Sequence, residues 1–225
     1  MVVVTDKHRE RYRQLRSGHD DLLQIMLRRL PDHVVVETGK RLGVFADNSL
    51  VFNSEREMST VMDYCIHDYR LDGQSIIEQY LKDTAVDPKS DHGVLLAAMV
   101  RSRYSVFAIK RVLTAWGIEV QDLLRGNRDF IMDFGLGETA MENFVIAGRT
   151  ISPAEYPFSM TSGGVLPCTR DALGTIGEVV PSRFGATGME IEALTPEKKS
   201  ELSAFLIKTV CRALRSQSED TTWER

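Results

Sequence analysis

The sequence predicts an α+β fold with an N-terminal helical module, a small antiparallel β-sheet or barrel-like module, and a C-terminal helix. Between Met58 and Tyr69 the apolar side chains recur at helical spacing, whereas the run YSVFAIKRVL, at 104–113, is rich in β-forming residues and apolar on both faces. A second apolar stripe at helical spacing runs from Leu202 to Leu214. These changes of period place the modules at 1–102, 103–167 and 168–225; the alternative is one integrated domain.

Composition limits the class of protein. The chain has 225 residues, 43% of them hydrophobic and 27% charged, with a net charge of −4, so an ordinary globular protein without a global basic field is expected. Three widely spaced cysteines argue against a disulfide framework. The start, MVVVTDKHRERYRQ, does not resemble a signal peptide, and no apolar run is long enough to span a bilayer. We therefore expect a cytoplasmic protein without a membrane partner.

Several helices are predicted in the first module. Residues 6–16 and 19–30 form two helices separated by Ser17-Gly18. Residues 32–42 fit either a strand, from the run HVVVE, or a helix ended by Gly43; the helix is favoured. Capping boxes open helices after Ser54 and Ser75, and a further helix covers 91–101.

Five short strands are predicted in the second module, which favours a small, strongly bent sheet or barrel. They cover 104–113, 118–123, 129–134, 143–151 and 158–161, with a hairpin turn at 125–127. The glycine pairs at 135 and 137 and at 163 and 164 are interpreted as breaks between secondary-structure elements.

The C-terminal part contains a helix-like stretch at 170–179 and then a loop at 181–188. Thr195 and Pro196 begin the last helix as cap and first residue. The polar tail, 216–225, is expected to be disordered.

Four segments resemble a group of uncharacterised bacterial proteins with a helical segment followed by a small β-module. The segments are MSTVMDYCIHDYRLDGQSIIEQYL, SRYSVFAIKRV, VQDLLRGNRDFIMD and FSMTSGGVLP, all within about residues 53–167. The resemblance implies that same arrangement in this chain and is silent on chemistry. Some relatives carry a C-terminal SEC-C metal-binding motif; this chain has only Cys168 and Cys211 in that part, so a zinc-adaptor role is not implied.

No catalytic, metal or cofactor site is predicted. Cys65 and His67 would point about 200° apart on a helix and could not share an ion. A hydrolase at the loop from Ser159 to Gly164 would need a histidine beside Ser159 or Ser162. The carboxylates of residues 46–100 are interpreted as a solvated helix surface; they include Asp63, Asp68, Asp72, Glu78, Asp83, Asp87 and Asp91.

Basic residues offer possible nucleic-acid contacts in two places. Arg9, Arg11 and Arg13 make the first helix basic, and Arg101, Arg103 and Arg111 could line one edge of the sheet. Among the nearby aromatic residues, Tyr104, Phe107 and Phe130 could stack bases, although Phe107 and Phe130 fit the core better.

The functional prediction is a non-catalytic intracellular binding or adaptor protein with a protein partner, and with oligomerisation left open. The first alternative is a nucleic-acid-associated protein using the basic N-terminal helix. The second is a hydrolase at the Ser159–Gly164 loop.

Overall fold

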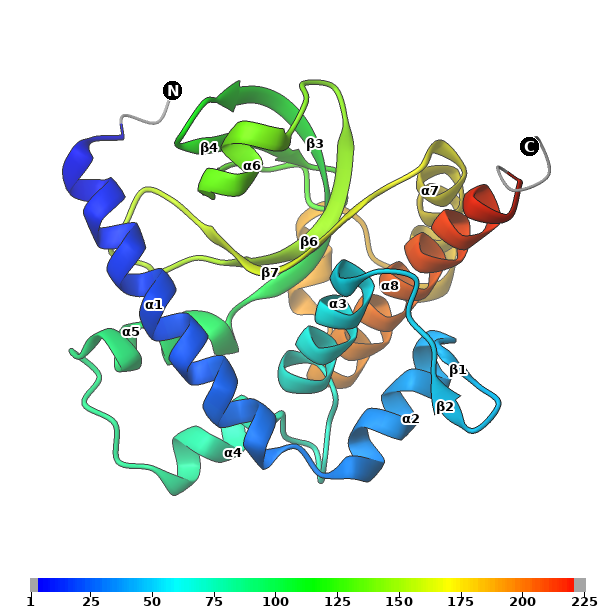
Figure 1. The fold of residues 1–225 in the computed structure, drawn as a ribbon, viewed down its shortest axis with the longest axis horizontal. Coiled ribbons are helices and arrows are strands. Elements are labelled where there is room, and N and C mark those ends of the chain that lie inside the picture. Colours follow the sequence, from blue (N-terminus) through cyan, green and yellow to red (C-terminus); the bar gives the residue numbers. More distant parts are fainter. Residues whose placement is uncertain (1–3, 221–225) are drawn as a thin grey trace.

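The computed structural model describes residues 4–220, the last three by their backbone alone, and confirms the α+β class (Figure 1). The helices are α1 (Asp6–Arg29), α2 (Asp32–Leu42), α3 (Glu55–His67), α4 (Ile76–Asp83), α5 (Asp91–Val100), α6 (Phe134–Thr139), α7 (Arg170–Phe184) and α8 (Pro196–Asp220), with a 3-10 helix, η1, at Gly188–Ala193. A short hairpin of β1 (Phe45–Ala46) and β2 (Ser49–Leu50) follows α2.

The main sheet has five strands: β3 (Arg103–Leu113), β4 (Gly117–Asp122), β5 (Arg128–Met132), β6 (Val145–Ile151) and β7 (Met160–Pro167). Their order is β5-β4-β3-β6-β7, and every neighbouring pair is antiparallel. The long β3 pairs with β6 through its first half and with β4 through its second half.

The two edges of this sheet meet. Ile131 forms a parallel bridge with Ser159, and the Met132 N–H donates to the Ser159 carbonyl at 2.8 Å. The sheet is therefore a nearly closed barrel, with α6 inserted between its third and fourth strands. This strand order and helix position are those of the five-stranded Greek-key barrel called the OB-fold.

Side chains from the strands fill the barrel or cover its walls. The interior cluster comprises Phe107, Ile109, Ile118, Val120, Ile131 and Ile146, and Leu136 and Ala140 of α6 pack against it. A Cβ atom on Gly137 would lie 2.8 Å from the backbone nitrogen of Gly117, so glycine is required where α6 approaches β4.

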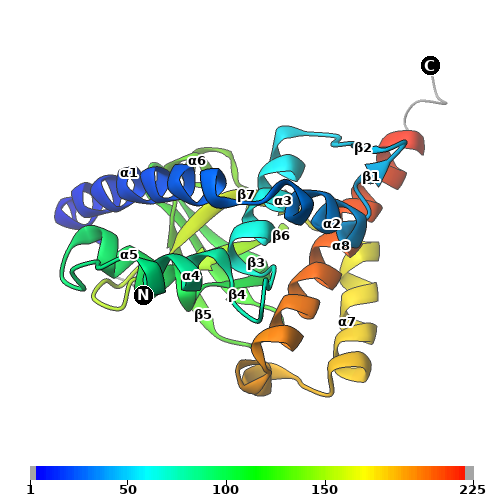
Figure 2. The same cartoon turned by 90° about the horizontal axis from the view of Figure 1, so that it is seen from below.

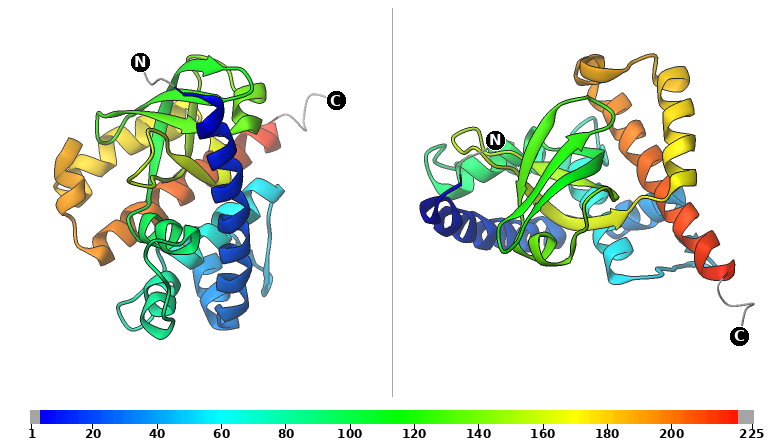
Figure 3. Two further views of the ribbon diagram at one scale, coloured as in Figure 1. Left: turned by 90° about the vertical axis from the view of Figure 1, so that its left-hand side faces the viewer. Right: turned by 90° about the horizontal axis from the view of Figure 1, so that it is seen from above.

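Helices cover the barrel on two sides (Figures 2 and 3). On one side α1, α4 and α5 enclose a core that includes Phe130, Met132 and Phe158 from the barrel. On the other side α2, α3, α7 and α8 pack over Tyr104, Val106, Ala147 and Leu166. The expectation that Phe107 and Phe130 belong to the core is confirmed, since each is 1% exposed.

The predicted break at Ser17-Gly18 is wrong, because α1 runs through it as a single helix of 24 residues. Its buried stripe continues at helical spacing on both sides of the pair, with Leu15, His19, Leu22 and Met26 at 0% exposure. Burying each large apolar side chain stabilises by roughly 1.5–3 kcal/mol, which exceeds the roughly 1 kcal/mol that glycine costs inside a helix.

The ambiguous segment 32–42 is a helix, as favoured, and Gly43 ends it in the left-handed conformation with φ of 76°. The caps at Ser54 and Ser75 are confirmed, and Ser90 caps α5; each serine accepts from a backbone N–H three residues later. Glu78 also closes a full capping box on the backbone of Ser75, whereas Glu57 reaches the N–H of Asn53 instead of Ser54.

Other boundaries differ from the prediction where an element continues through glycine or proline. The 135–137 segment lies in α6, with Asp133 as its N-cap, instead of a loop. Strand β7 begins at Met160 and continues through Gly163 and Gly164 to Pro167. Helix α7 continues past Pro181 to Phe184, and α8 extends to Asp220, so 216–220 is helical; residues 221–225 of the predicted disordered tail lie outside the described residues.

Candidate functional site

A buried ion-pair network lies where α3 meets β6. The Arg149 side chain is 2% exposed; its Nε donates to Asp63 at 2.7 Å, and its Nη2 donates to Asp68. The Ser203 hydroxyl of α8 donates to the other oxygen of Asp68 at 3.1 Å. The register of β6 against β7 shifts around Arg149, and such a bulge re-aims a side chain.

This network corrects the expectation that the carboxylates of residues 46–100 are solvated, because Asp63 and Asp68 are buried. One signal was available in the sequence: Arg149 interrupts the apolar strand β6. A charge in an apolar element requires a buried partner of opposite sign. Burial alone would raise the pKa of Asp63, but the Arg149 guanidinium holds it below its ordinary value.

A serine, a histidine and an aspartate adjoin this network in an order that resembles a catalytic triad. Ser102 Oγ lies 3.0 Å from His67 Nδ1, and His67 Nε2 lies 3.6 Å from Asp63 Oδ1. However, burial and the Arg149 charge lower the pKa of His67 to about 3, whereas a general base works best near the ambient pH. Arg149 also engages the carboxylate that would have to stabilise an imidazolium. The arrangement favours a structural role.

A cavity of about 480 Å³ opens beside this network, between the start of β3, the end of β6 and the first turns of α8. We call it the arginine pocket. Its charged lining comprises Arg101, Arg103, Arg125, Lys199, Asp68 and Glu192, and its uncharged lining comprises Val100, Ser102, Tyr104, Thr150, Ser152, Leu202 and Ser203. The barrel, α5 and the C-terminal helices therefore all contribute to one concave surface.

The cationic side chains of the arginine pocket differ in how far they are already engaged. Arg125 is 7% exposed and bonds to Glu192 at 2.5 Å and to Ser105 at 3.0 Å, and Lys199 donates to the Glu192 carbonyl at 2.7 Å. Arg103 forms ion pairs with Asp122 and Asp129 at 3.8 and 3.9 Å, although neither distance is short enough for a hydrogen bond. Arg101 is exposed and makes no ion pair with any described residue. Arg101 is thus the least engaged cation of the pocket, and Arg103 is engaged by ion pairs without a hydrogen bond.

Two hydroxyl groups in the pocket wall are buried without a partner among the described residues. They belong to Tyr104 and Thr150, each 2% exposed. The Nε atom of Arg103 is also buried and unpartnered. An unsatisfied buried polar group costs about 1–3 kcal/mol. These atoms have almost no accessible surface, and the pairing of Tyr104 with Arg149 and of Thr150 with Arg103 places the two hydroxyl-bearing side chains on opposite faces of the sheet, so they do not face the open cavity.

The predicted nucleic-acid contacts fall in three separate places. Arg101 and Arg103 come together in the arginine pocket, while Arg111 is exposed on the second half of β3 and does not line it. Arg9 lies 4.1 Å from the centroid of the Trp116 ring, and Arg11 pairs with Asp91 at 2.6 Å. The six arginines do not form one surface.

The predicted hydrolase loop contains two serine side chains with different surroundings. Ser159 donates to Asp129 at 2.7 Å and lies 2.7 Å from the Ser152 hydroxyl, and the buried Ser162 lies beside Asp63. Neither serine has a histidine as a hydrogen-bond partner among the described residues, whereas the hydrolase alternative needs one. Within the same residues, no group of three or more potential ligands is arranged to hold a metal ion. No described helix is long and apolar enough to cross a membrane.

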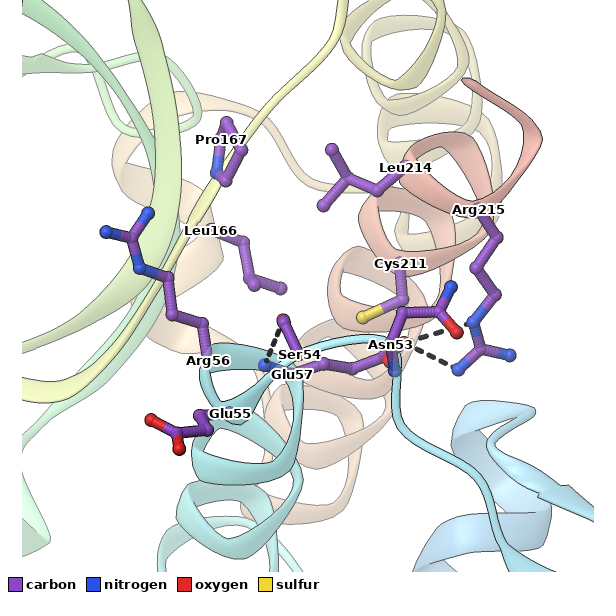
Figure 4. Close-up of a pocket in the computed structure, with 10 residues that line it drawn as sticks. All are labelled: Asn53, Ser54, Glu55, Arg56, Glu57, Leu166, Pro167, Cys211, Leu214 and Arg215. Carbon is purple, nitrogen blue, oxygen red and sulfur yellow. Dashed lines mark hydrogen bonds and ion pairs between the residues drawn. The ribbon is translucent and has the colours of Figure 1, made fainter. Parts of the chain in front are cut away.

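A second cavity, of about 520 Å³, lies between the N-terminus of α3, the end of β7 and α8 (Figure 4). Leu166, Pro167 and Leu214 make much of its wall apolar. Its buried carboxylate, Glu57, accepts from Arg215 at 2.5 Å and from the Asn53 N–H at 2.6 Å. Burial and Glu57 raise the pKa of Cys211 to about 12, which keeps its thiol protonated. This cavity offers fewer unsatisfied groups than the arginine pocket.

The fold and the pocket together define an α+β protein in which helices enclose an OB-like barrel. The chain matches the family described as Family of unknown function (DUF7986) over residues 6–172, from α1 to the start of α7, and it belongs to that family. No curated protein and no solved structure matches it significantly. Most of α7 and all of α8, which supplies one wall of the arginine pocket, lie beyond the matched residues.

Proposed function

We propose that this chain is an intracellular bacterial binding protein without catalytic activity, and that the arginine pocket is where it holds a small anionic molecule. The support is the presence of two arginine side chains that make no hydrogen bond within the described residues, Arg101 and Arg103, in the lining of one cavity. A volume of about 480 Å³ suits a small organic ligand.

The pocket is built from rigid elements, which supports binding without a large rearrangement. Leu202 and Leu206 of α8 are buried at 2% and 0% exposure, so the wall that α8 provides is held by the core. Asp68 is fixed between Arg149 and Ser203. A preformed site loses little conformational entropy when its ligand binds.

Nucleic-acid association is the second candidate, because barrels of this topology often bind single strands and Arg101 and Arg103 lie together. The aromatic residues on the α1 side of the barrel are less suited to binding nucleic acid. There Tyr12 packs on Phe134 at 4.7 Å between ring centroids, and Arg11 lies over Tyr156 at 5.3 Å, so α1 already occupies these rings.

The test is to denature the purified protein and identify the small molecules it releases by mass spectrometry. Arg103→Gln removes a donor of the pocket, and Arg111→Gln makes the same change on the same strand outside it. We expect a compound released by the wild type and by Arg111→Gln but not by Arg103→Gln. Equal release from all three proteins, or release from none together with no binding of small anions, would contradict the proposal.

A further inference from the structure

We propose that the open mouth of the barrel is a second ligand site, and that it binds a small free carboxylic acid with an apolar body. This mouth site is a cavity of about 470 Å³ between the end of β7, strands β3 and β6, and α6. It shares no lining residue with the arginine pocket, so the inference does not depend on the proposed function. The mouths of β-barrels are frequent places for small-molecule sites.

The barrel is open at this end because strand pairing stops. Strand β7 forms a bridge with β5 only at Ser159, and from Met160 to Pro167 it pairs only with β6 within the described residues. Ile109 and Ile146 belong to the cluster that fills the barrel, and both line the mouth site. A ligand in this cavity therefore contacts the apolar interior of the barrel.

The same apolar face continues outward to the rim of the site. Side chains alternate along a strand, so Phe144 lies on the same face as Ile146, and the Ile109 N–H donates to the Phe144 carbonyl at 2.8 Å. The backbone of Phe144 is thus fixed, yet its side chain is 52% exposed. Met141, which follows α6 and also lines the site, is 56% exposed. Large apolar side chains exposed around an apolar cavity indicate a binding surface.

The polar side chains of the lining limit the chemistry of the ligand. Three described residues contribute them: Arg56, Asp133 and Thr139. The two carboxylate oxygens of Asp133 accept from the Leu136 N–H at 3.0 Å and from the Thr161 hydroxyl at 2.6 Å, and the Thr139 hydroxyl donates to a backbone carbonyl at 2.7 Å. Arg56 is exposed, and its guanidinium makes no hydrogen bond or ion pair with a described residue.

The ligand therefore needs one acceptor group and an otherwise apolar body. A carboxylate matches the guanidinium of Arg56 in charge and in the geometry of paired hydrogen bonds, whereas an ammonium group would be repelled by it. Figure 4 shows the Arg56 side chain beside β7, extending away from the α8 side chains of the neighbouring cavity. Because exposed ion pairs are weak, the apolar body supplies most of the affinity.

The test uses aliphatic carboxylates of increasing length, from butanoate to octanoate, with octan-1-ol as an uncharged probe. Binding to the whole chain is measured by calorimetry and by nuclear magnetic resonance at neutral pH, where the acids are ionised. We expect the affinity to rise about threefold with each added methylene group, because each buries further apolar surface. Octanoate should shift the methyl resonance of Met141 and leave that of Met189, which lies outside the site, unchanged.

Two pairs of variants test the body and the head group of the ligand separately. Phe144→Ser should weaken octanoate about tenfold, and Met189→Ser, at an exposed apolar position outside the site, should leave it unchanged. Arg56→Gln should weaken octanoate about threefold without changing the binding of octan-1-ol, and Arg111→Gln should affect neither. Phe144 and Arg56 are exposed, so the fold is expected to survive both changes, which circular dichroism checks.

Several results would overturn the inference. Absence of octanoate binding, or equal binding to the wild type and to Phe144→Ser, would show that the acid does not occupy the mouth site. If Arg56→Gln leaves octanoate binding unchanged, the carboxylate is wrong. If the wild type sediments as a dimer, Phe144→Ser as a monomer, and octanoate does not bind, a second copy of the chain covers this surface instead. None of these results bears on the arginine pocket, which the release experiment tests.

Discussion

Two regions of the molecule gather arginine residues, and they use them differently. On the α1 side, Arg9 stacks on Trp116 and donates to the Ala115 carbonyl at 3.3 Å, and Arg11 bonds to Asp91 and to Tyr156. In the arginine pocket, Arg101 and Arg103 make no hydrogen bond within the described residues. The sequence treats both sets alike, as basic residues. What separates a structural arginine from a binding one is whether the fold already satisfies its donors.

The largest loss of stability is expected from substitution of Arg149, a buried arginine that pairs with two buried carboxylates. Arg149→Ala leaves Asp63 and Asp68 buried without their counter-charge, and such a change costs about 3–5 kcal/mol of unfolding free energy. Urea denaturation measures the loss, with Arg111→Ala as an exposed control on the neighbouring strand. A loss below about 1 kcal/mol, the size seen for exposed pairs, would mean that the network is solvated.

The second-largest loss of stability is expected from Tyr12→Ala, which tests whether the packing of α1 on the barrel stabilises the fold. Tyr12 is 6% exposed and packs between Phe134 and Phe158, so Tyr12→Ala should cost about 3 kcal/mol. Thermal and urea unfolding measure the change. If stability is unaffected while nucleic-acid binding appears, α1 masks a binding surface and the contrast between the two regions is reversed.

Acidification should destabilise the protein through His67. Its pKa in the folded state is about 3, mainly because it is buried, whereas in the unfolded chain it is near 6.5. The unfolded state therefore binds the proton first, and stability present above pH 6.5 is lost as the pH falls toward 3, with a limiting slope of about 1.4 kcal/mol per pH unit.

The buried His19 has its pKa lowered in the same direction and adds to this slope. His67→Gln should reduce the slope of unfolding free energy between about pH 6.5 and pH 5, the range just below the ordinary histidine pKa. An unchanged slope in that variant would show that His67 is protonated in the folded protein and is not neutral beside Arg149.

The smallest changes in stability are expected from substitutions of two exposed or half-buried arginines, one in each region, and comparing them distinguishes a structural arginine from a binding one. Arg11→Gln should cost about 0.5–1 kcal/mol at low salt because it breaks the pair with Asp91, and Arg101→Gln should change stability by less than about 0.5 kcal/mol. Ligand binding should respond in the opposite order. If Arg101→Gln is the more destabilising variant, its side chain has a structural partner and the proposed site loses one of its two free donors.

Sequence patterns that act over a few residues, such as helix caps and runs of strand-forming residues, predicted much of the fold. The serine caps at Ser54 and Ser75 are confirmed, since hydrogen bonding within a few residues decides them. The β-rich run of β3 is confirmed because its β-branched and aromatic residues favour a strand. The errors arose where tertiary packing overrides a local preference. Buried contacts carry α1 through Gly18, and contact with β4 fixes α6 around Gly137.

The candidate site is predicted only in part by the sequence. Arg101 and Arg103 stand out as basic residues, but Tyr104 stands out only as a stacking platform, and no local pattern singles out Arg125, Thr150 or Lys199. These residues come from three barrel segments and from α8, and no spacing in the sequence reveals that they meet. The buried state of Asp63 and Asp68 depends likewise on Arg149, which lies 86 and 81 positions further along.

That separation has a consequence for synthesis on the ribosome. When α3 leaves the exit tunnel, its two carboxylates have no counter-charge, and burying them then would be costly. The counter-charge arrives only with β6, and Ser203, which holds Asp68 from the other side, arrives later still with α8. Helix α3 is therefore expected to stay hydrated on that face, without its final packing, until most of the chain has been translated.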